Sequence, residues 1–447
     1  MGTINRRSFI KSTGIFTAAM LSKGLFAEGG ANSKINVGVI GLGKQSYAHI
    51  PQLASDSRCM LTAISDVDDA RLNYVKQDVE KRYAQQGKKV EVKTYKDFRG
   101  LLADPSIDAV FIVTPDHWHA IMSILAARAG KHIYCEKPMT FSVLEGEQVA
   151  KAVKSAGVVF QTGSQQRSEP AFRNAVWLAR SGMLGNVREV YCNVPWRFPT
   201  IYNWDAEVLP QSIDWDMWIG PAPMRSFTHH LLDLIRPAPE YAYAYPWGEW
   251  RWHSDYGNGM QADWGAHHFD IAQWGLGMDG KGPKHIYVYP KQNPSFPNDK
   301  KCIYYEYANG AKVFYGSPSI LQKKGFNKPS AMVTFIGDEG IACASRGGIF
   351  WADKPSLRSV KVRPGGDVPM SNTNHIGNFI EAILTGSPVI CPVEIGESSC
   401  NMCLIGNIAH KLGRHLEWDW RKKRFVGDPK ANALLWREHR GEWKNII

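Results

Sequence analysis

The sequence has no run of roughly 18 or more uncharged apolar residues, the length that a membrane-spanning helix requires. It also lacks low-complexity tracts, a collagen-like repeat and internal repeats at the spacing of a solenoid. These absences exclude a helical membrane protein, a fibrous protein and a repeat array. With 44% hydrophobic and 21% charged residues, the composition is that of a globular protein.

A strong excess of one charge is also missing. The formal net charge of +11 falls to +7 without residues 1–27, which contain four basic residues and no acidic residue. Arg421–Arg424 is the one run of basic residues, and a solvated loop explains it. Nucleic acid is therefore not expected as a partner.

The eight cysteines lack the spacing of a disulfide framework or of a zinc site. Cys400 and Cys403 form a lone C-x-x-C motif in what is expected to be a long amphipathic helix. Buried helix cysteines explain this pair better than redox chemistry does. No metal is predicted as a resident cofactor.

The first 33 residues are expected to be a targeting segment. Asn5–Lys11 resembles the twin-arginine export signal, with Arg6 and Arg7 as the arginine pair, and a weakly apolar stretch and a small-residue cleavage site at Ala27 follow. This resemblance implies export of a folded protein to the periplasm, where an uncleaved signal would retain it at the inner membrane. The alternative is a disordered tail with an accidental arginine pair.

A length of 447 residues predicts more than one domain. From residue 34 to about residue 165, short apolar strands alternate with helix-length segments. The expected strands are 35–40, 61–65, 109–113, 132–135 and 158–161, and the expected helices are 46–53, 69–84, 117–129 and 143–156. Near-continuous Val, Ile and Phe strands between helices are typical of a parallel sheet covered on both faces, so we predict a doubly wound α/β domain over 34–165.

Beyond residue 165 the pattern changes. Ten of the sixteen tryptophans lie between Trp177 and Trp274, and strand-like stretches then follow one another at 284–289, 302–307, 312–315 and 331–336. Strands without intervening helices are expected to pair antiparallel. Helices over 375–384 and 397–412 complete a predicted α+β domain, 166–447, with a large antiparallel sheet.

A glycine-rich turn follows the first predicted strand. Gly41 permits the tight turn, Leu42 follows it, and Gly43 allows close approach of a pyrophosphate to the start of the next helix. Ser46 replaces the third glycine of the dinucleotide pattern. Asp66, at the end of the second strand, has the spacing of the carboxylate that binds ribose hydroxyls, and it would repel a 2′-phosphate. The pattern predicts NAD and disfavours NADP; the alternative is a glycine turn without a ligand.

Polar residues also follow the later strands, at 114–119 and 136–138. Because ligands of open α/β sheets bind beyond the carboxyl ends of the strands, these groups are expected to converge on one crevice.

Asp263, His267 and Asp270 share one face of a predicted helix, at spacings of four and three residues. A carboxylate one turn from a histidine can orient the ring and stabilise its cation, which suits a general base. A structural hydrogen-bonded pair is the commoner explanation of such spacing. A metal site from the three residues fits no strong template.

These motifs together resemble the glucose–fructose oxidoreductase, inositol dehydrogenase and rhizopine-catabolism (Gfo/Idh/MocA) family. Glu136-Lys137-Pro138 follows a Rossmann strand, and Asp263-x-Gly265-x-His267-x-x-Asp270 stands in the second domain. The resemblance implies a Rossmann domain with an open antiparallel sheet used for dimer or tetramer contacts. It also implies NAD-dependent oxidation of sugars or polyols.

By this resemblance Lys137 and His267 are catalytic, with Asp263 as the partner of Lys137. The matching cofactor positions are Gly41, Leu42, Gly43, Gln45, Asp66, Thr114, His119 and Glu136, and the expected substrate contacts are Arg167 and His268. A sugar carbinol would give hydride to the nicotinamide while His267 removes the hydroxyl proton and Lys137 stabilises the oxyanion.

Export would separate the enzyme from the cellular nicotinamide pool, so the nucleotide is expected to stay tightly bound. Reoxidation then requires a second substrate, an unknown electron carrier, or return of hydride to the same sugar after cleavage. The last route is a redox-neutral glycosidase or lyase, which is the alternative function. A non-catalytic sugar-binding protein on the same fold is the third hypothesis.

Overall fold

The computed structural model describes residues 34–195, 197–233, 247–290, 301–317, 320–323, 326, 331–360 and 374–447. The chain divides into Met1–Ser33 and one compact unit, Lys34–Ile447. The predicted export signal lies outside the described residues. Among the helices that are described, none combines the length and apolarity needed to cross a bilayer.

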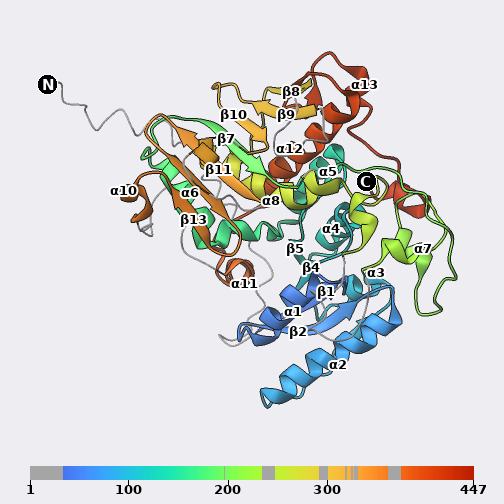
Figure 1. Cartoon of the computed structure of the whole chain (residues 1–447). Coiled ribbons are helices and arrows are strands. Elements are labelled where there is room, and N and C mark those ends of the chain that lie inside the picture. The colour runs from blue at the N-terminus through green and yellow to red at the C-terminus, as the bar shows by residue number, and fades with distance from the viewer. Residues whose placement is uncertain are drawn as a thin grey trace. The chain divides into compact units, whose positions relative to one another are not determined.

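A six-stranded parallel sheet forms the first half of the compact unit (Figure 1). Its strand order is β3-β2-β1-β4-β5-β6, the order of a dinucleotide-binding fold. The strands are β1 (Ile35–Ile40), β2 (Cys59–Ser65), β3 (Lys93–Tyr95), β4 (Ala109–Ile112), β5 (His132–Cys135) and β6 (Phe160–Thr162). The connecting helices are α1 (Ser46–Ser55), α2 (Asp69–Gln85), α3 (Phe98–Ala103), α4 (His119–Arg128) and α5 (Val143–Ala156).

The burial of the central strands shows that the sheet is covered on both faces. Every residue of β4 is buried, and Val37 and Val39 of β1 are 0% exposed. Polar caps fix where the flanking helices begin: the Asp68 carboxylate accepts from the Ala70 N–H at the start of α2. The predicted doubly wound domain is confirmed.

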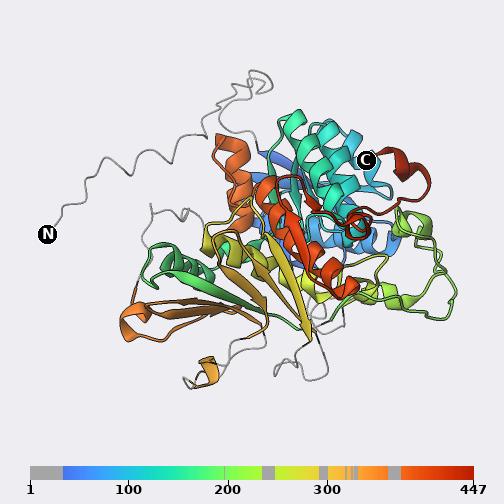
Figure 2. The ribbon, with the colours of Figure 1, turned by 90° about the horizontal axis from the view of Figure 1, so that it is seen from above.

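The second half contains a nine-stranded sheet of order β13-β12-β11-β7-β10-β9-β8-β14-β15 (Figure 2). Its strands are β7 (Val187–Asn193), β8 (His285–Pro290), β9 (Lys301–Glu306), β10 (Lys312–Tyr315), β11 (Met332–Gly337), β12 (Ile341–Ser345), β13 (Ile349–Ala352), β14 (Leu416–Asp419) and β15 (Arg424–Phe425).

The predicted antiparallel pairing is confirmed for β8 with β9 and for β9 with β10. It is wrong for β10 and β11, which are not neighbours. β7, which the sequence did not predict, lies between them, parallel to β10 and antiparallel to β11, so the sheet is mixed. The long connection from β7 to β10 contains the helix α8 (Gly259–Leu276) and permits a parallel crossover, which a hairpin loop does not.

Side chains alternate across this sheet. Ile286, Ile303, Tyr305 and Val313 are buried on one face, beneath α8 and α12 (Val393–Leu412). The opposite face carries half-buried aromatic rings that contact one another across strands. Tyr287–Tyr304 and Phe314–Tyr191 are stacked, with centroids 4.6 Å and 4.7 Å apart, and Tyr304–Phe314 is tilted at 5.2 Å.

The C-terminal segment also covers the nucleotide-binding sheet. α11 (His375–Thr385) places Phe379 in the same buried cluster as Val37 and Phe111. Beyond it, the Thr162 N–H at the end of β6 donates to the Cys391 carbonyl. A boundary at residues 165/166 thus does not separate the hydrophobic cores, because part of the second segment completes the first.

The described cysteines agree with the interpretation from spacing. Seven of them are free thiols and buried, including Cys400 and Cys403 within α12. Burial raises the pKa of Cys400 to about 12, so this thiol is inert at neutral pH.

Candidate active site

The glycine-rich turn joins β1 to α1. Gly41 has φ +91°, and a Cβ atom there would lie 2.6 Å from the Val113 carbonyl oxygen, so only glycine fits. Ser46, in the place of the third glycine, is buried and its hydroxyl donates to the Gly43 carbonyl at 2.7 Å. Ser46 therefore fits at the position where the dinucleotide pattern has its third glycine, and its hydroxyl group stabilises the turn.

Asp66 ties the end of β2 to this turn. Its carboxylate accepts from the Leu42 N–H at 2.7 Å and from the Asp68 N–H at 3.0 Å. Burial raises the pKa of Asp66, although Arg71 opposes the shift. The carboxylate lies at the wall of a cavity, where a ribose hydroxyl can reach it.

This cavity has a volume of ≈ 440 Å³ and runs from the glycine turn to α8. It brings together most of the residues that the sequence selected. Those that line it are Gly41, Gly43, Gln45, Asp66, Thr114, Glu136, Lys137, Asp263 and His267.

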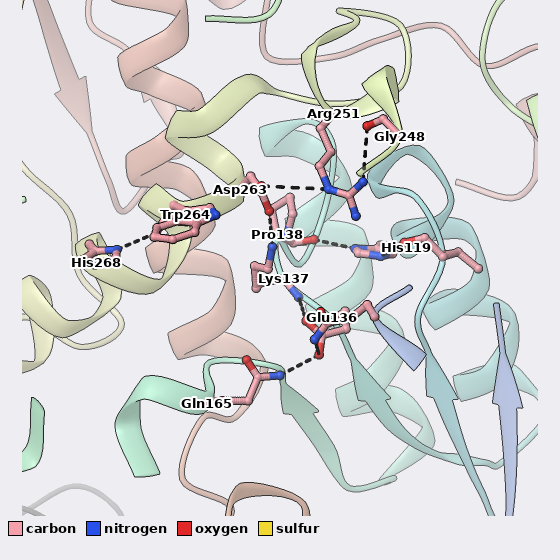
Figure 3. A network of polar contacts seen from close by, with 12 residues as sticks. His119, Glu136, Lys137, Pro138, Gln165, Gly248, Arg251, Asp263, Trp264 and His268 are labelled. Carbon is pink, nitrogen blue, oxygen red and sulfur yellow. Dashed lines mark hydrogen bonds and ion pairs between the residues drawn. The ribbon is translucent and has the colours of Figure 1, made fainter. Parts of the chain in front are cut away.

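Lys137 and Asp263 form the central contact of the site (Figure 3). Lys137 follows β5, Asp263 belongs to the second turn of α8, and the Lys137 Nζ donates to the Asp263 Oδ1 at 2.5 Å. Burial would raise the pKa of Asp263, but Lys137 and Arg251 outweigh it, and the pKa is lowered. An ionised Asp263 thus holds the ammonium group in place at the cavity wall.

The structure pairs Asp263 with Lys137, as the family resemblance implies, and not with His267, as the helical spacing suggested. Asp263 contacts Lys137 and lies 4.0 Å from the Arg251 Nε, so it does not serve to orient the histidine. Burial lowers the pKa of His267 well below its usual value, and the positive charges of Arg346 and Lys137 lower it further. His267 is therefore a neutral ring at neutral pH, able to accept a proton but weakly basic.

Glu136 supports the site from below. Its carboxylate makes a 2.7 Å hydrogen bond with His49 Nε2. It also accepts from the Gln165 amide at 2.6 Å (Figure 3). Burial acts to raise the pKa of Glu136, and the bond to His49 and the charge of Lys137 lower it overall. The group is an ionised anchor for the start of the Lys137 turn.

Two of the predicted cofactor positions do not reach the cavity. The His119 ring lies between backbone carbonyls, with its Nδ1 2.6 Å from the Pro138 oxygen and its Nε2 2.9 Å from the Thr114 oxygen. It holds the segment after β4 against the Lys137 turn. Leu42 has a buried side chain and contributes only its N–H, to Asp66.

The two predicted substrate contacts are likewise not at the cavity. Arg167 is 1% exposed and its guanidinium pairs with Asp270 at 2.6 Å and with Asp279 at 2.7 Å. His268 is 0% exposed, and its Nδ1 lies 2.8 Å from the Trp264 carbonyl oxygen. Since Asp270 pairs with Arg167, the metal alternative from Asp263, His267 and Asp270 also fails.

Asp116 and Trp118 belong to the segment 114–119, which was predicted to reach the crevice, and both line the cavity. Asp116, to which no role was assigned, is 5% exposed and has its pKa raised to about 7 by burial. The sequence interpretation missed Arg251 and Arg346, which no local signal marked and which reach the cavity from distant parts of the chain. It also assigned no individual role to the other tryptophans of the wall: Trp218, Trp247, Trp250, Trp252 and Trp264.

Family models match both halves of the chain. Residues 35–164 match the oxidoreductase family, NAD-binding Rossmann fold, and residues 177–445 match the oxidoreductase family, C-terminal alpha/beta domain, both of the Gfo/Idh/MocA group. The chain belongs to the Gfo/Idh/MocA oxidoreductase family. The resemblance drawn from the Gly-x-Gly, Glu-Lys-Pro and Asp-x-Gly-x-His motifs is confirmed.

Individual relatives are similar over parts of the chain. Myo-inositol 2-dehydrogenase of Thermotoga maritima is 32% identical over 151 residues, 34% of this chain and 42% of that protein. A glycosyl hydrolase family 109 protein of Shewanella baltica is 29% identical over 212 residues, 42% of this chain and 45% of that protein. The aligned part therefore spans less than half of these relatives. The crystal structure of aldose–aldose oxidoreductase from Caulobacter crescentus, 21% identical, superposes with a TM-score of 0.55 over 86% of this chain and all of that one, which supports the fold.

The residues present fit the NAD that the Gfo/Idh/MocA fold binds. The Gly41 turn leaves no room for a side chain, Gly43 lines the cavity, and the N-terminus of α1 follows. Asp66 is the carboxylate that would accept from the ribose hydroxyls. Lys137 and His267 line the same cavity.

Proposed function

We propose that this protein is an exported NAD-dependent oxidoreductase that oxidises a CH–OH carbon of a sugar or sugar derivative, in carbohydrate breakdown. The observation that carries the proposal is the cavity itself. It joins a glycine turn and Asp66, which suit a dinucleotide, to the Lys137–Asp263 pair and His267.

Different residues of the chain have different roles in the proposed reaction. When bound, NAD supplies the acceptor for hydride. Lys137, held by Asp263, donates a hydrogen bond to the substrate hydroxyl oxygen and stabilises its negative charge as the proton leaves. His267 lies in the same cavity as a neutral ring and accepts that proton. The surrounding tryptophans exclude water and offer apolar faces to a sugar ring.

The preference for NAD over NADP rests on Asp66. A buried carboxylate at the ribose position repels a 2′-phosphate, while its oxygens accept from ribose hydroxyls. Tight binding is expected because an exported enzyme has no nucleotide pool from which to exchange. Protein isolated from the bacterial envelope should therefore retain NAD(H) through dialysis, and protein that retains none would oppose the exported form of the proposal.

Replacement of Lys137 by Met tests the chemistry. The variant should bind NAD as the wild type does but lose roughly 10²- to 10⁴-fold in kcat, because the oxyanion loses its positive partner. NADH formation in the presence of sugars measures kcat, and thermal unfolding checks the fold. Lys284→Met, on an exposed residue beside β8, is the control. An unchanged kcat in K137M would contradict the assigned role.

A redox-neutral glycosidase or lyase is the second candidate. The similarity to the family 109 glycosyl hydrolase, over 212 residues, favours it. The two functions separate in one experiment with glycosides and retained NAD. A rise in NADH absorbance indicates net oxidation, and release of the aglycone without that rise indicates redox-neutral cleavage.

We also propose that the protein is a homodimer or homotetramer through the outer face of the nine-stranded sheet. The row of contacting rings formed by Tyr287, Tyr304, Phe314 and Tyr191 supports this, since half-buried aromatic side chains suit an interface. Sedimentation of the chain tests it, and a monomer at micromolar concentration would oppose it.

A further inference from the structure

Arg346 brings an additional positive charge to the cavity. It follows β12, at the tip of the hairpin to β13, where Gly347 and Gly348 have φ of +73° and +77°. Its guanidinium lies over the Trp264 ring, 4.4 Å from the centroid, and the residue lines the cavity with His267. The nine-stranded sheet thus extends one arginine to the reacting end of the site.

This guanidinium has no carboxylate partner among the residues that the structure describes. Its Nε is buried and makes no hydrogen bond there. Burial lowers the pKa of Arg346, and the negative charges of Asp263, Glu169 and Glu136 only partly oppose this shift. A mostly buried arginine remains charged, so its desolvation is unfavourable until an anion binds.

Two other cations that line the cavity have carboxylate partners. Lys137 is paired with Asp263, and Arg251 lies 3.1 Å from the Asp233 carboxylate. Arg346 lines the cavity near His267 without such a pair in the described part of the chain, so an anionic group of a ligand can pair with it.

A second unpartnered group lines the same cavity. Gln166 is 5% exposed, and its amide nitrogen donates to Glu169 at 3.1 Å. Its amide oxygen is buried and has no hydrogen-bond partner within the described part of the chain. An amide oxygen accepts from a hydroxyl group. The cavity thus offers a cation, an acceptor for hydroxyls and tryptophan faces, which are the complements of an acidic sugar.

We propose that the substrate is an acidic sugar, whose carboxylate or sulfate group pairs with Arg346 while its oxidised carbinol faces Lys137 and His267. This inference rests on the proposed oxidoreductase function and adds the substrate class. A planar carboxylate can take two parallel hydrogen bonds from the guanidinium, and a sulfate ester can take the same pair.

Bound anion would also change His267. Burial is the main cause of the low pKa of His267, and the positive charges of Arg346 and then of Lys137 lower it further. The nearby rings of His268 and His375 are neutral at neutral pH, because burial lowers their pKa values to about 3 and about 4. Neutralising Arg346 removes one of these influences, so the pKa of the base rises when an acidic sugar binds. The substrate class and the basicity of the catalytic ring are then linked.

Binding to matched sugars tests the inference. The full chain is titrated calorimetrically with methyl glycosides of hexuronic acids, with O-sulfated methyl hexosides and with the corresponding neutral methyl hexosides. At least one acidic glycoside should bind roughly 10- to 100-fold more tightly than its neutral partner, and Arg346→Gln should remove that difference. The uronoside and sulfate arms identify which anion is recognised. Arg346→Lys, which keeps the positive charge, should retain part of the preference for the acidic glycoside.

Arg421→Gln is the matched control, because its guanidinium also lies over a tryptophan, 4.5 Å from the Trp420 centroid, but on an exposed residue outside the cavity. Thermal unfolding shows whether each variant is folded. Equal binding of acidic and neutral glycosides, or no binding of any acidic glycoside, overturns the inference. Failure of the proposed function would show separately, as a chain that binds no NAD(H).

Discussion

Asp116 is a carboxyl group held near the reacting end of the cavity by the segment after β4. Burial raises its pKa to about 7, with Lys137 opposing and Asp263 adding to the rise. Between about pH 4 and pH 7 the folded protein therefore holds this proton more tightly than the unfolded chain does. Asp116 thus reduces stability progressively as the pH rises through this window.

Replacement of Asp116 by Asn should remove this dependence. The amide keeps an acceptor for the N–H of Asn258 and carries no charge to desolvate. At pH 8 we expect D116N to unfold at a higher temperature than the wild type. Its free energy of unfolding should be larger by about 1.4 kcal/mol for each unit of the pKa shift, and near pH 4 the difference should vanish. Thermal unfolding across this range measures it.

Asp104 provides a control of opposite sign. Hydrogen bonds from Lys93 and Ser106 lower the pKa of its carboxylate, so Asp104 stabilises the fold at neutral pH and loses this effect as the pH falls. Asp104→Asn should lower the unfolding temperature at pH 8. If D116N and D104N shifted stability in the same direction at pH 8, the assignment of the Asp116 pKa would be wrong.

At the scale of elements, the N-terminus of α1 already faces an anion. The Lys44 N–H donates to the Asp233 Oδ2 at 3.2 Å, and the same carboxylate accepts from the Gly248 N–H at 2.6 Å. A Cβ on Gly43 would lie 3.1 Å from Asp233. The carboxylate thus lies where the turn would approach a pyrophosphate, and the two negative groups repel.

We predict that Asp233→Asn strengthens NAD binding by roughly tenfold, because the amide keeps the acceptor and removes the repelling charge. Fluorescence or calorimetric titration with NAD measures the Kd. Asp338→Asn is the control, on the turn between β11 and β12. Unchanged or weaker binding in D233N would show that Asp233 does not compete with the dinucleotide.

Local signals were sufficient for most elements of the first domain. β1, β5 and α5 have the predicted bounds, since buried β-branched runs and a glycine C-cap at Gly157 are readable in sequence. β3, three residues long and mostly exposed, carries too little pattern to predict. The parallel pairing of β10 with β7 depends on which strands meet in space, which the sequence of either strand does not record.

The candidate site divides in the same way. Gly41, Asp66 and Lys137 stand in motifs and were found. Arg346 was missed because it follows a strand that carries no motif. It reaches the cavity because α6 (Pro170–Arg180) packs against both α8 and the β12–β13 hairpin. Arg167 and His268 were misplaced, since a charged residue in a motif region is equally able to form a buried ion pair.

At the scale of the whole molecule, the nucleotide-binding sheet depends on the C-terminal segment for its cover. Phe379 of α11 is 0% exposed and meets Phe111 edge to face, with centroids 5.5 Å apart, and Tyr134 at 5.8 Å. Ile376 and Ile380 complete this contact in the same cluster. Folding of the dinucleotide site is therefore coupled to residues more than 200 positions later in the chain.

Phe379→Ala should lower the free energy of unfolding by about 3–5 kcal/mol, the usual loss for a fully buried phenylalanine. Urea unfolding measures it, and NAD binding should weaken at denaturant concentrations where the wild type still binds. Leu384→Ala, on the same helix but 40% exposed, is the control and should cost far less. If the two variants were equally stable, the contact of α11 with the first sheet would not contribute to the stability of that sheet. A large loss in F379A alone, accompanied by loss of NAD binding, shows that the first sheet requires the end of the chain to form its site.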